Sequence, residues 1–444
     1  MDPSYLNANT ETLIWDMPEP AKEAQTKFTG SKYFATMDLI KSFWQFELHD
    51  DSKHLFTFYA HPYGQYRFER VAMGAKNSSA YVQRTMTHIL RNAGLIGNGV
   101  EITTDDIILH APTINELITL IQRTLHTLDE HNLHVHPGKV KLIRKKLIFN
   151  GLLITNEGIM VDPNRIKGMV NMPLPRTVGD VYQFYCAAGW LRSHIPDIAE
   201  LIQPLQKFVT QTFKTRKTKR RTMRAADNIP LSATPWNDEN NEQFHSLQNT
   251  ITQSITKAYR NFDKQVCIFT DASDTAWSYI ITQCEPGELD KPWDEQQHQI
   301  LTVNSGMFKN NQVGWDMCCK EAFPIKECFE RHRDLLRGNL PVVSVNDHKN
   351  LLYISVDAYR HSTVTQAARH RLARWVLFMA EENIRVVHIP GIQNHLADLL
   401  SRNGNKGYVT AKHPNDRTTK TNTESTAEAP RPAQQEAKTM NELE

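Results

Sequence analysis

Acidic residues that directly follow short apolar segments constrain the fold of this chain more than any other feature of its sequence. Asp38 comes after residues 33–37, and the doublet Asp105-Asp106 interrupts the apolar-rich residues 100–110. Carboxylates inside such segments are unfavourable unless a cation neutralises them. Two Mg²⁺ ions about 3.5–4 Å apart would do so and would support chemistry on a phosphate. Taken singly, the doublet could form only a β-turn, and Asp38 could cap the helix that follows.

A second acidic set lies in the C-terminal half, where strand and helix patterns alternate. Side chains at strand ends of such sheets converge on one crevice. Four carboxylates there would repel one another unless metal is bound, and two Mg²⁺ would again serve. Each acid alone could be a helix cap or a surface residue. The set comprises Asp271 after residues 266–270, Glu321 at the opening of an apolar helix, Asp347 after residues 342–346, and Asp398 after the strand-like residues 385–389.

Length, charge and cysteine usage narrow the class of protein. The chain has 444 residues, enough for roughly two to four domains, and its net charge of +2 excludes a uniformly polybasic binder. Basic residues do gather at 214–224, where they could contact phosphates, form a solvated linker or direct nuclear import. The six cysteines form no CxxC pair and no zinc-finger spacing. Without a signal peptide or a long apolar run, we expect a reduced, intracellular protein with no membrane segment.

Hydrophobic periodicity predicts a multidomain α/β and α+β architecture. Residues from 403 onward have almost no large apolar side chains and are expected to be disordered. The predicted elements are strands at 33–37 and 66–73, a strand pair over 100–110, helices over 77–93 and 114–133, a hairpin joining 147–155 to 158–161, helices over 163–209 separated at Pro173, Pro175 and Pro196, and a helix opening at Pro235-Trp236.

Ordered sequence blocks resemble the reverse transcriptase–RNase H region of Pol polyproteins from gypsy-like long-terminal-repeat retrotransposons. Thr103-Thr104-Asp105-Asp106 falls where that family has an aromatic-x-Asp-Asp motif. The resemblance extends from about residue 30 to 402. The other polymerase-like blocks are 31–45, 62–68, 72–74, 81–83, 133–139 and 149–151, followed by thumb-like residues 184, 190–192, 195–196 and 204–205. The RNase H-like blocks are 270–273, 320–323, 347–351, 388–391 and 397–402.

The resemblance implies a polymerase palm with truncated fingers, a helical thumb and connection, and an RNase H-like mixed-sheet domain. We expect truncated fingers because only 37 residues precede Asp38. The implied division is an upstream segment at 1–30, the palm with partial fingers at 31–161, the thumb and connection with the basic linker at 162–235, the RNase H-like domain at 236–403 and the tail at 404–444.

The resemblance also assigns roles to residues. Phe43 would lie beneath the sugar of the incoming nucleotide, although a core aromatic is the alternative, and His388 is interpreted as structural. The implied catalytic metal ligands, for two Mg²⁺ per site with Mn²⁺ as an alternative, are Asp38, Asp105 and Asp106 in the palm and Asp271, Glu321, Asp347 and Asp398 in the RNase H-like domain. The implied substrate-binding residues are Phe43, Met73, Gly74, Gln83, Phe149 and Gly151.

Together these assignments predict an RNA-directed DNA polymerase and a ribonuclease that acts on RNA–DNA hybrids. The implied partners are an RNA template, a DNA primer and deoxynucleotides, with self-association as an open alternative, in cytoplasmic particles or in the nucleus. Thr103, Ser79 and Asn150 depart from the family's aromatic, proline and apolar residues at these positions. These departures and the short upstream segment leave two alternatives: a nuclease with an impaired polymerase, or a decayed element that only binds nucleic acid.

Overall fold

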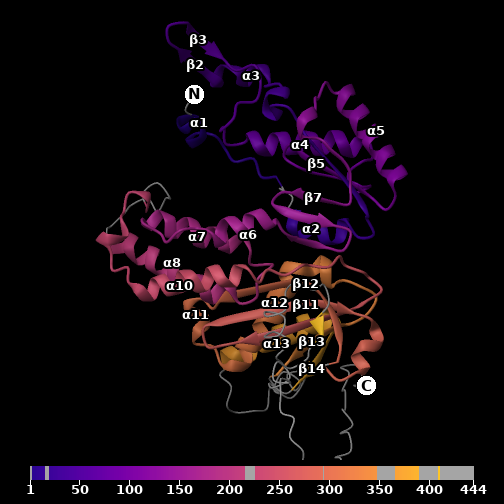
Figure 1. Cartoon of the computed structure of the whole chain (residues 1–444), viewed down its shortest axis with the longest axis vertical. Helices are drawn as coiled ribbons and strands as arrows, with labels where there is room; N and C mark the ends of the chain where they lie inside the picture. The colour runs from indigo at the N-terminus through magenta and orange to yellow at the C-terminus, as the bar shows by residue number, and fades with distance from the viewer. Residues whose placement is uncertain are drawn as a thin grey trace, which may run out of the picture. The chain divides into compact units, whose positions relative to one another are not determined.

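The chain forms two compact units, Met1–Ile159 and Met160–Glu444 (Figure 1). The computed structural model describes residues 3–15, 20–215, 226–293, 295–347, 366–389 and 409–410. Asp398, the tail after residue 410 and most of the 214–224 basic run lie outside the described residues. The mixed helix-and-sheet architecture agrees with the expected fold class, while the five-part division stays a prediction.

The first unit is built around a four-stranded sheet with the order β4-β5-β1-β6. Its core strands are β1 (Tyr33–Asp38), β4 (Val100–Thr103), β5 (Asp106–Ala111) and β6 (Lys141–Arg144). Two helices, α4 (Ser78–Asn92) and α5 (Ile114–Glu130), pack their apolar faces on this sheet. The helix predicted over 114–133 thus forms, and the Thr113 hydroxyl caps it by accepting a hydrogen bond from the backbone N–H of Glu116.

Shorter elements complete the first unit. The predicted strand over 66–73 is wrong beyond Arg67, because the partner strand begins at Thr57, which pairs with Arg67. Past that point Phe68 and Val71 donate their backbone hydrogen bonds to Phe56 and Phe46 instead. These elements are α1 (Ser4–Ala8), α2 (Pro20–Lys27), η1 (Ser42–Gln45), α3 (Asp50–Lys53), η2 (His54–Phe56), β2 (Thr57–Ala60), β3 (Gly64–Arg67), η3 (Pro137–Lys139), β7 (Lys146–Phe149) and β8 (Leu152–Thr155). Strand β9 (Ile159–Val161) starts at the last residue of the first unit and continues into the second.

The second unit begins with a helical bundle. Its helices are α6 (Pro163–Val170), α7 (Val178–Trp190), α8 (Ile198–Thr215), the short η4 (Leu231–Ala233) and α10 (Asp238–Ile251). The predicted breaks at Pro173, Pro175 and Pro196 fall between these helices, whereas Pro204 lies inside α8. Phe184 and Phe244 meet in the bundle core with ring centroids 4.2 Å apart.

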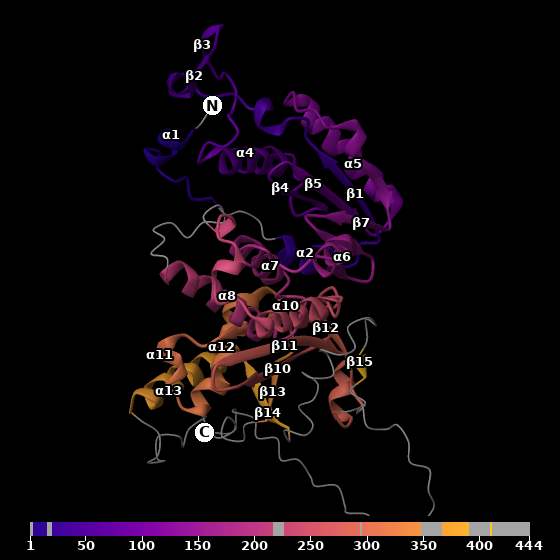
Figure 2. The same cartoon turned by 60° about the vertical axis from the view of Figure 1, so that its left-hand side comes forward.

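A six-stranded mixed sheet, ordered β14-β13-β10-β11-β12-β15, forms the rest of the second unit (Figure 2). Strands β10, β11 and β12 are antiparallel, and β13 and β14 run parallel to β10. Helices α12 and α13 cover one face, and a smaller apolar core lies on the other. The elements are β10 (Gln265–Ala272), β11 (Ala276–Cys284), η5 (Pro286–Asp290), β12 (Gln297–Met307), α11 (Asn310–Val313), α12 (Met317–Leu336), β13 (Val342–Asn346), α13 (Gln366–Glu381), β14 (Ile384–His388) and β15 (Val409–Thr410).

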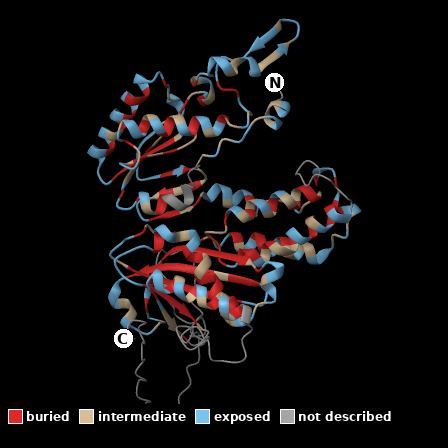
Figure 3. Cartoon of the chain, turned by 180° about the vertical axis from the view of Figure 1, so that it is seen from behind, coloured by how far each residue is buried: buried red, intermediate tan, exposed pale blue. Residues whose placement is uncertain are grey.

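Burial on both faces explains why these strands are continuous apolar runs (Figure 3). Along β10, Val266 and Ile268 face the core beneath α12, while Cys267 and Phe269 face the smaller core. The strand leaves the interior only at Asp271, which is exposed. The buried strand β10 therefore places the carboxylate of Asp271 at the end of the sheet, where solvent reaches it.

Candidate active sites

Three of the four C-terminal acids converge in the second unit. Asp271 lies near the end of β10, Glu321 lies in α12, and Asp347 directly follows β13. Their carboxylate oxygens all lie within 4.8 Å of one another. This convergence follows from the parallel pairing of β10 with β13, which places both strand ends at one edge. Asp398, the fourth predicted member, lies outside the described residues.

Glu321 carries the strongest electrostatic perturbation of this cluster. Its side chain is 3% exposed, and burial, with the nearby charges of Asp271 and Asp347, raises the pKa of Glu321 to about 8. Its Oε2 is buried without a hydrogen-bond partner among the described residues. A hard-oxygen donor set with an unsatisfied buried carboxylate oxygen fits a divalent cation.

Neighbouring contacts fix the positions of these acids. Helix α12 begins at Met317, so Glu321 lies inside the helix instead of opening it as predicted; the Asp316 side chain caps the helix by accepting from Cys319 N–H. On the sheet side, the ring Nε2 of His388 lies 3.1 Å from the carbonyl oxygen of Asp347. That contact agrees with a structural role for His388.

In the first unit, β1 and β5 bring the other acids together. Asp38 and Asp106 are direct partners across the antiparallel pair, and Asp105 lies in the turn between β4 and β5. Thr104 in this turn has a left-handed φ of 56°. The doublet therefore makes a β-turn, as the simpler interpretation held, and that turn also sets Asp105 and Asp106 beside Asp38.

Burial, neighbouring carboxylates and one lysine shape the electrostatics of this site. Burial and the neighbouring carboxylates, including Asp38, raise the pKa values of Asp105 and Asp106. The Lys139 ammonium, from η3, lies 3.1 Å from both carboxylate oxygens of Asp38. These three acids are less tightly clustered than those around Glu321, because their carboxylate oxygens in the described structure do not all lie within 4.8 Å of one another. The carboxylate oxygens of these acids are nevertheless ligands that suit a divalent metal, and the raised pKa values of Asp105 and Asp106 show that the positive charge of Lys139 does not offset burial and the neighbouring carboxylates.

Among the predicted substrate residues, Phe43 and Met73 differ in exposure. Phe43 in η1 is half-buried against the core of the first unit, while Met73 is 56% exposed. Gly74 has a φ of +85°, and its carbonyl accepts a hydrogen bond from the Asn7 side chain. Contact of these residues with substrate stays a prediction.

Gln83 lies beneath the acidic turn and is 2% exposed. Its amide oxygen accepts a hydrogen bond from the backbone N–H of Thr104, and its amide nitrogen lies 3.1 Å from the Thr87 hydroxyl. The direct contact of Gln83 is thus with the turn that carries the doublet, and its role toward a substrate stays a prediction. Sequence reasoning missed this relation and the Lys139–Asp38 contact, because each depends on long-range folding.

The remaining two predicted residues, Phe149 and Gly151, lie at a tight hairpin turn. Phe149 ends β7 and is 7% exposed, and Asn150-Gly151 connects it to β8 with φ values of 50° and 77°. Positive φ at both central residues defines a type I′ turn, for which Asn-Gly is the preferred pair. The predicted hairpin over 147–161 therefore contains an additional turn, and its Asn-Gly signal could have revealed it.

Comparison with known proteins identifies one domain in each unit. Residues 3–154 match the family model described as reverse transcriptase (RNA-dependent DNA polymerase). Residues 261–381 match the RNase H-like domain found in reverse transcriptase. The chain is 26% identical over 399 residues to the retrovirus-related Pol polyprotein from transposon 297 of Drosophila melanogaster, covering 90% of the chain and 34% of that protein.

Other relatives and solved structures agree. The Pol polyprotein from transposon gypsy of the same species is 23% identical, with 90% of this chain and 36% of the relative covered. A foamy viral protease–reverse transcriptase solved with an RNA/DNA hybrid shares the fold, with a TM-score of 0.67 and 16% identity over 96% of this chain and 51% of that one. A second foamy viral structure, solved with double-stranded DNA, gives a TM-score of 0.68 and 18% identity over 87% of this chain and 62% of that one.

The folds and acidic clusters define a reverse transcriptase joined to an RNase H-like domain. Over 90% of its length the chain is similar to the Pol polyproteins of gypsy and other transposons, and it spans about a third of the length of the curated relatives above. Domains of these two kinds generally use divalent metal ions. Within the described residues, no helix is both long and apolar enough to cross a membrane.

Proposed function

We propose that the second unit hydrolyses the RNA strand of RNA–DNA hybrids and that the first unit extends a DNA primer on an RNA template. The observation that carries the nuclease assignment is the convergence of Asp271, Glu321 and Asp347 within 4.8 Å. Charge-dense oxygen clusters of this size match the ligand set for two metal ions. A foamy viral relative of this fold was solved with an RNA/DNA hybrid, which supports the substrate class.

In the proposed nuclease, the three carboxylates hold Mg²⁺, with Asp398 as a fourth ligand. When bound, the metal pair would lower the pKa of an attacking water and stabilise the leaving oxygen. Glu321 must lose its proton before it can act as a ligand, because its pKa is about 8 without metal. His388, through its contact with the Asp347 carbonyl oxygen, keeps the end of β13 in place.

In the proposed polymerase, Asp38, Asp105 and Asp106 would hold Mg²⁺, which would supply the positive charge that binds the phosphates of the incoming deoxynucleotide. Gln83 fixes the turn that carries the doublet, and the Asn150-Gly151 turn positions the primer end. Lys139 neutralises Asp38 while no metal is bound. We expect cleavage to exceed extension, because the polymerase acids are less tightly clustered and Thr103 replaces the family's aromatic residue.

Hybrid cleavage tests the proposal directly. The full chain should cut a labelled RNA–DNA hybrid in Mg²⁺ and leave double-stranded DNA intact. Asp271→Asn keeps the side-chain shape but removes a metal ligand, so it should abolish cleavage without lowering the thermal midpoint. Asp334→Asn, an exposed acid on α12, is the matched control and should cleave normally. Cleavage that survives Asp271→Asn would refute the nuclease assignment.

A further inference from the structure

Two cysteines and one histidine meet in the smaller core of the second unit, away from the carboxylates. Cys267, Cys284 and His298 come from β10, β11 and β12, and their ligand atoms all lie within 4.8 Å of one another. Each residue is at most 2% exposed. Cys267 lies four residues before Asp271, roughly 13 Å along the strand. The two clusters are therefore separate.

Strand register explains the convergence. Cys267 pairs with Thr282, so Cys284, two residues further along β11, lies on the same face of the sheet. Gln283 pairs with Gln299, so the residues next to them, Cys284 and His298, also share that face. No local sequence spacing encodes this arrangement, because each ligand is on a different strand.

Hydrogen bonds fix the tautomer of His298. The Gln296 amide nitrogen donates to the carbonyl oxygen of Lys291 at 2.9 Å, which leaves the Gln296 amide oxygen facing His298 Nε2, also at 2.9 Å. Nε2 must therefore donate. The other nitrogen, Nδ1, therefore carries the lone pair, which accepts a hydrogen bond from the Thr282 hydroxyl at 2.9 Å in this structure. A bound metal would take the place of that hydrogen bond. An imidazole whose distal N–H is held by a buried acceptor is the usual arrangement of a metal-ligating histidine.

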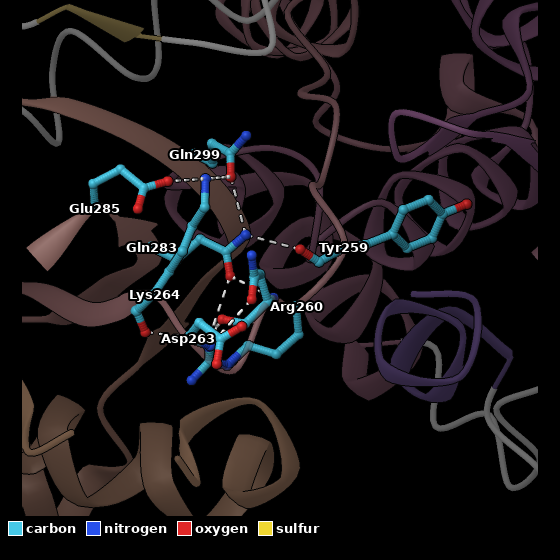
Figure 4. A network of polar contacts seen from close by, with 8 residues as sticks. Tyr259, Arg260, Asp263, Lys264, Gln283, Glu285 and Gln299 are labelled. Carbon is cyan, nitrogen blue, oxygen red and sulfur yellow. Dashed lines mark hydrogen bonds and ion pairs between the residues drawn. The ribbon is translucent and has the colours of Figure 1, made fainter. Parts of the chain in front are cut away.

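A polar network on the opposite face holds the two strands in register (Figure 4). The Gln283 amide nitrogen donates to the Gln299 side chain and to the carbonyl oxygen of Tyr259. The Lys264 ammonium reaches Gln299 at 3.2 Å and Glu285 at 3.0 Å. Since Gln283 and Gln299 directly adjoin Cys284 and His298, this network fixes the backbone that presents both ligands.

We propose that Cys267, Cys284 and His298 bind one zinc-class divalent cation that stabilises the RNase H-like sheet. Thiolates and imidazole are the ligands such cations prefer, and two sulfurs on one tetrahedral Zn²⁺ lie about 3.8 Å apart, within the span of the cluster. Three protein ligands leave a fourth position for water. The surroundings, which include Phe269, Ile300 and the partly buried Trp293, would shield the cation from solvent.

Cobalt(II) gives a direct readout, because thiolate ligands produce a charge-transfer absorption that carboxylates do not. The reduced, metal-stripped full chain should bind one Co²⁺ with this absorption in excess Mg²⁺, and Zn²⁺ should displace it. Cys284→Ser and His298→Asn should remove or strongly weaken the signal. Gln296→Leu should weaken binding by about 10- to 100-fold, since it removes the partner that orients His298.

Matched controls separate this site from other ligands. Cys328→Ser changes a cysteine buried in the other core, Cys186→Ser changes an exposed one, and Asp271→Asn alters the carboxylate cluster. All three should keep the cobalt signal. If a ligand variant does not fold, the wild-type titration decides, since absence of the thiolate absorption at one equivalent overturns the proposal. A signal that persists in folded Cys284→Ser, or a Cys267–Cys284 disulfide in the native chain, would also overturn it.

Discussion

The Lys139 ammonium lies 3.1 Å from both carboxylate oxygens of Asp38, across 101 residues of sequence. It provides the positive charge next to three acids in the structure without metal. Lys139→Met should therefore destabilise the chain in EDTA, by about 0.2–1 kcal/mol because Lys139 is largely solvent-exposed. In Mg²⁺ the loss should shrink, since the metal then supplies the charge.

Urea unfolding with and without Mg²⁺ measures this difference. Lys141→Met, at an exposed position on β6, is the control and should show no metal-dependent change. An equal loss for Lys139→Met in EDTA and in Mg²⁺ would show that Lys139 does not substitute for metal charge.

Of the two proposed activities, the buried amide of Gln83 should matter for polymerisation and not for hybrid cleavage. Gln83→Leu leaves the Thr104 N–H without its acceptor, which should lower the free energy of unfolding by about 1–3 kcal/mol. Primer extension should fall by at least tenfold, while hybrid cleavage stays unchanged. Thr87→Val removes only the weaker partner of Gln83 and should extend primers almost normally. If both variants lose extension equally, the turn contact is not the cause.

Glu321 should make stability without metal depend on pH. Its pKa is about 8 in the folded chain against a usual value of 4.5, so between these pH values the folded state keeps a proton that the unfolded state has released. This contribution to stability is complete below pH 4.5 and is lost as pH rises through about 8. In EDTA, Glu321→Gln should therefore be more stable than wild type near pH 8.5 and about equal to it near pH 5.

Thermal midpoints across this pH range check the expectation. Glu381→Gln, an exposed acid on α13, should follow the wild-type curve. Mg²⁺ should flatten the difference between wild type and Glu321→Gln, because metal binding favours the ionised carboxylate. A Glu321→Gln curve parallel to wild type in EDTA would contradict the raised pKa.

Gly151 should tolerate no side chain. Its φ of +77° is strained for any residue with a Cβ, so Gly151→Ala should destabilise the chain by about 1–2 kcal/mol. Gly168→Ala, in the exposed part of helix α6 with no atom near the added methyl, should instead stabilise it by about 0.5–1 kcal/mol. Chemical denaturation should give changes in the free energy of unfolding of opposite sign for the two variants. Destabilisation by both substitutions would contradict the turn assignment.

Periodicity and turn chemistry predicted the elements whose partners are local or whose burial is continuous. The helix over α5 and the apolar strand before Asp271 are examples, and the rule that strand ends converge correctly grouped Asp271 with Asp347. The strand predicted through residue 73 was wrong because strand length depends on where its partner begins. Local patterns carry no such information.

Contacts between distant residues set the limit of the sequence prediction. The pairing of Lys139 with Asp38 requires the path of the chain after α5, and the cluster of Cys267, Cys284 and His298 requires the register of three strands. Cysteine spacing alone excluded a zinc finger but could not reveal ligands on neighbouring strands. The Asn150-Gly151 turn is different, because its signal was present in the sequence.

The central claim is that one chain carries two separate metal-dependent sites, and one paired measurement tests it. Hybrid cleavage and primer extension are assayed side by side in Mg²⁺ for wild type, Asp271→Asn and Asp105→Asn, with Asp129→Asn as an exposed control. Asp271→Asn should lose cleavage and keep extension, and Asp105→Asn should lose extension and keep cleavage. If either folded variant lost both activities, the two sites would not be independent. If both variants kept both activities, neither acid would belong to an active site.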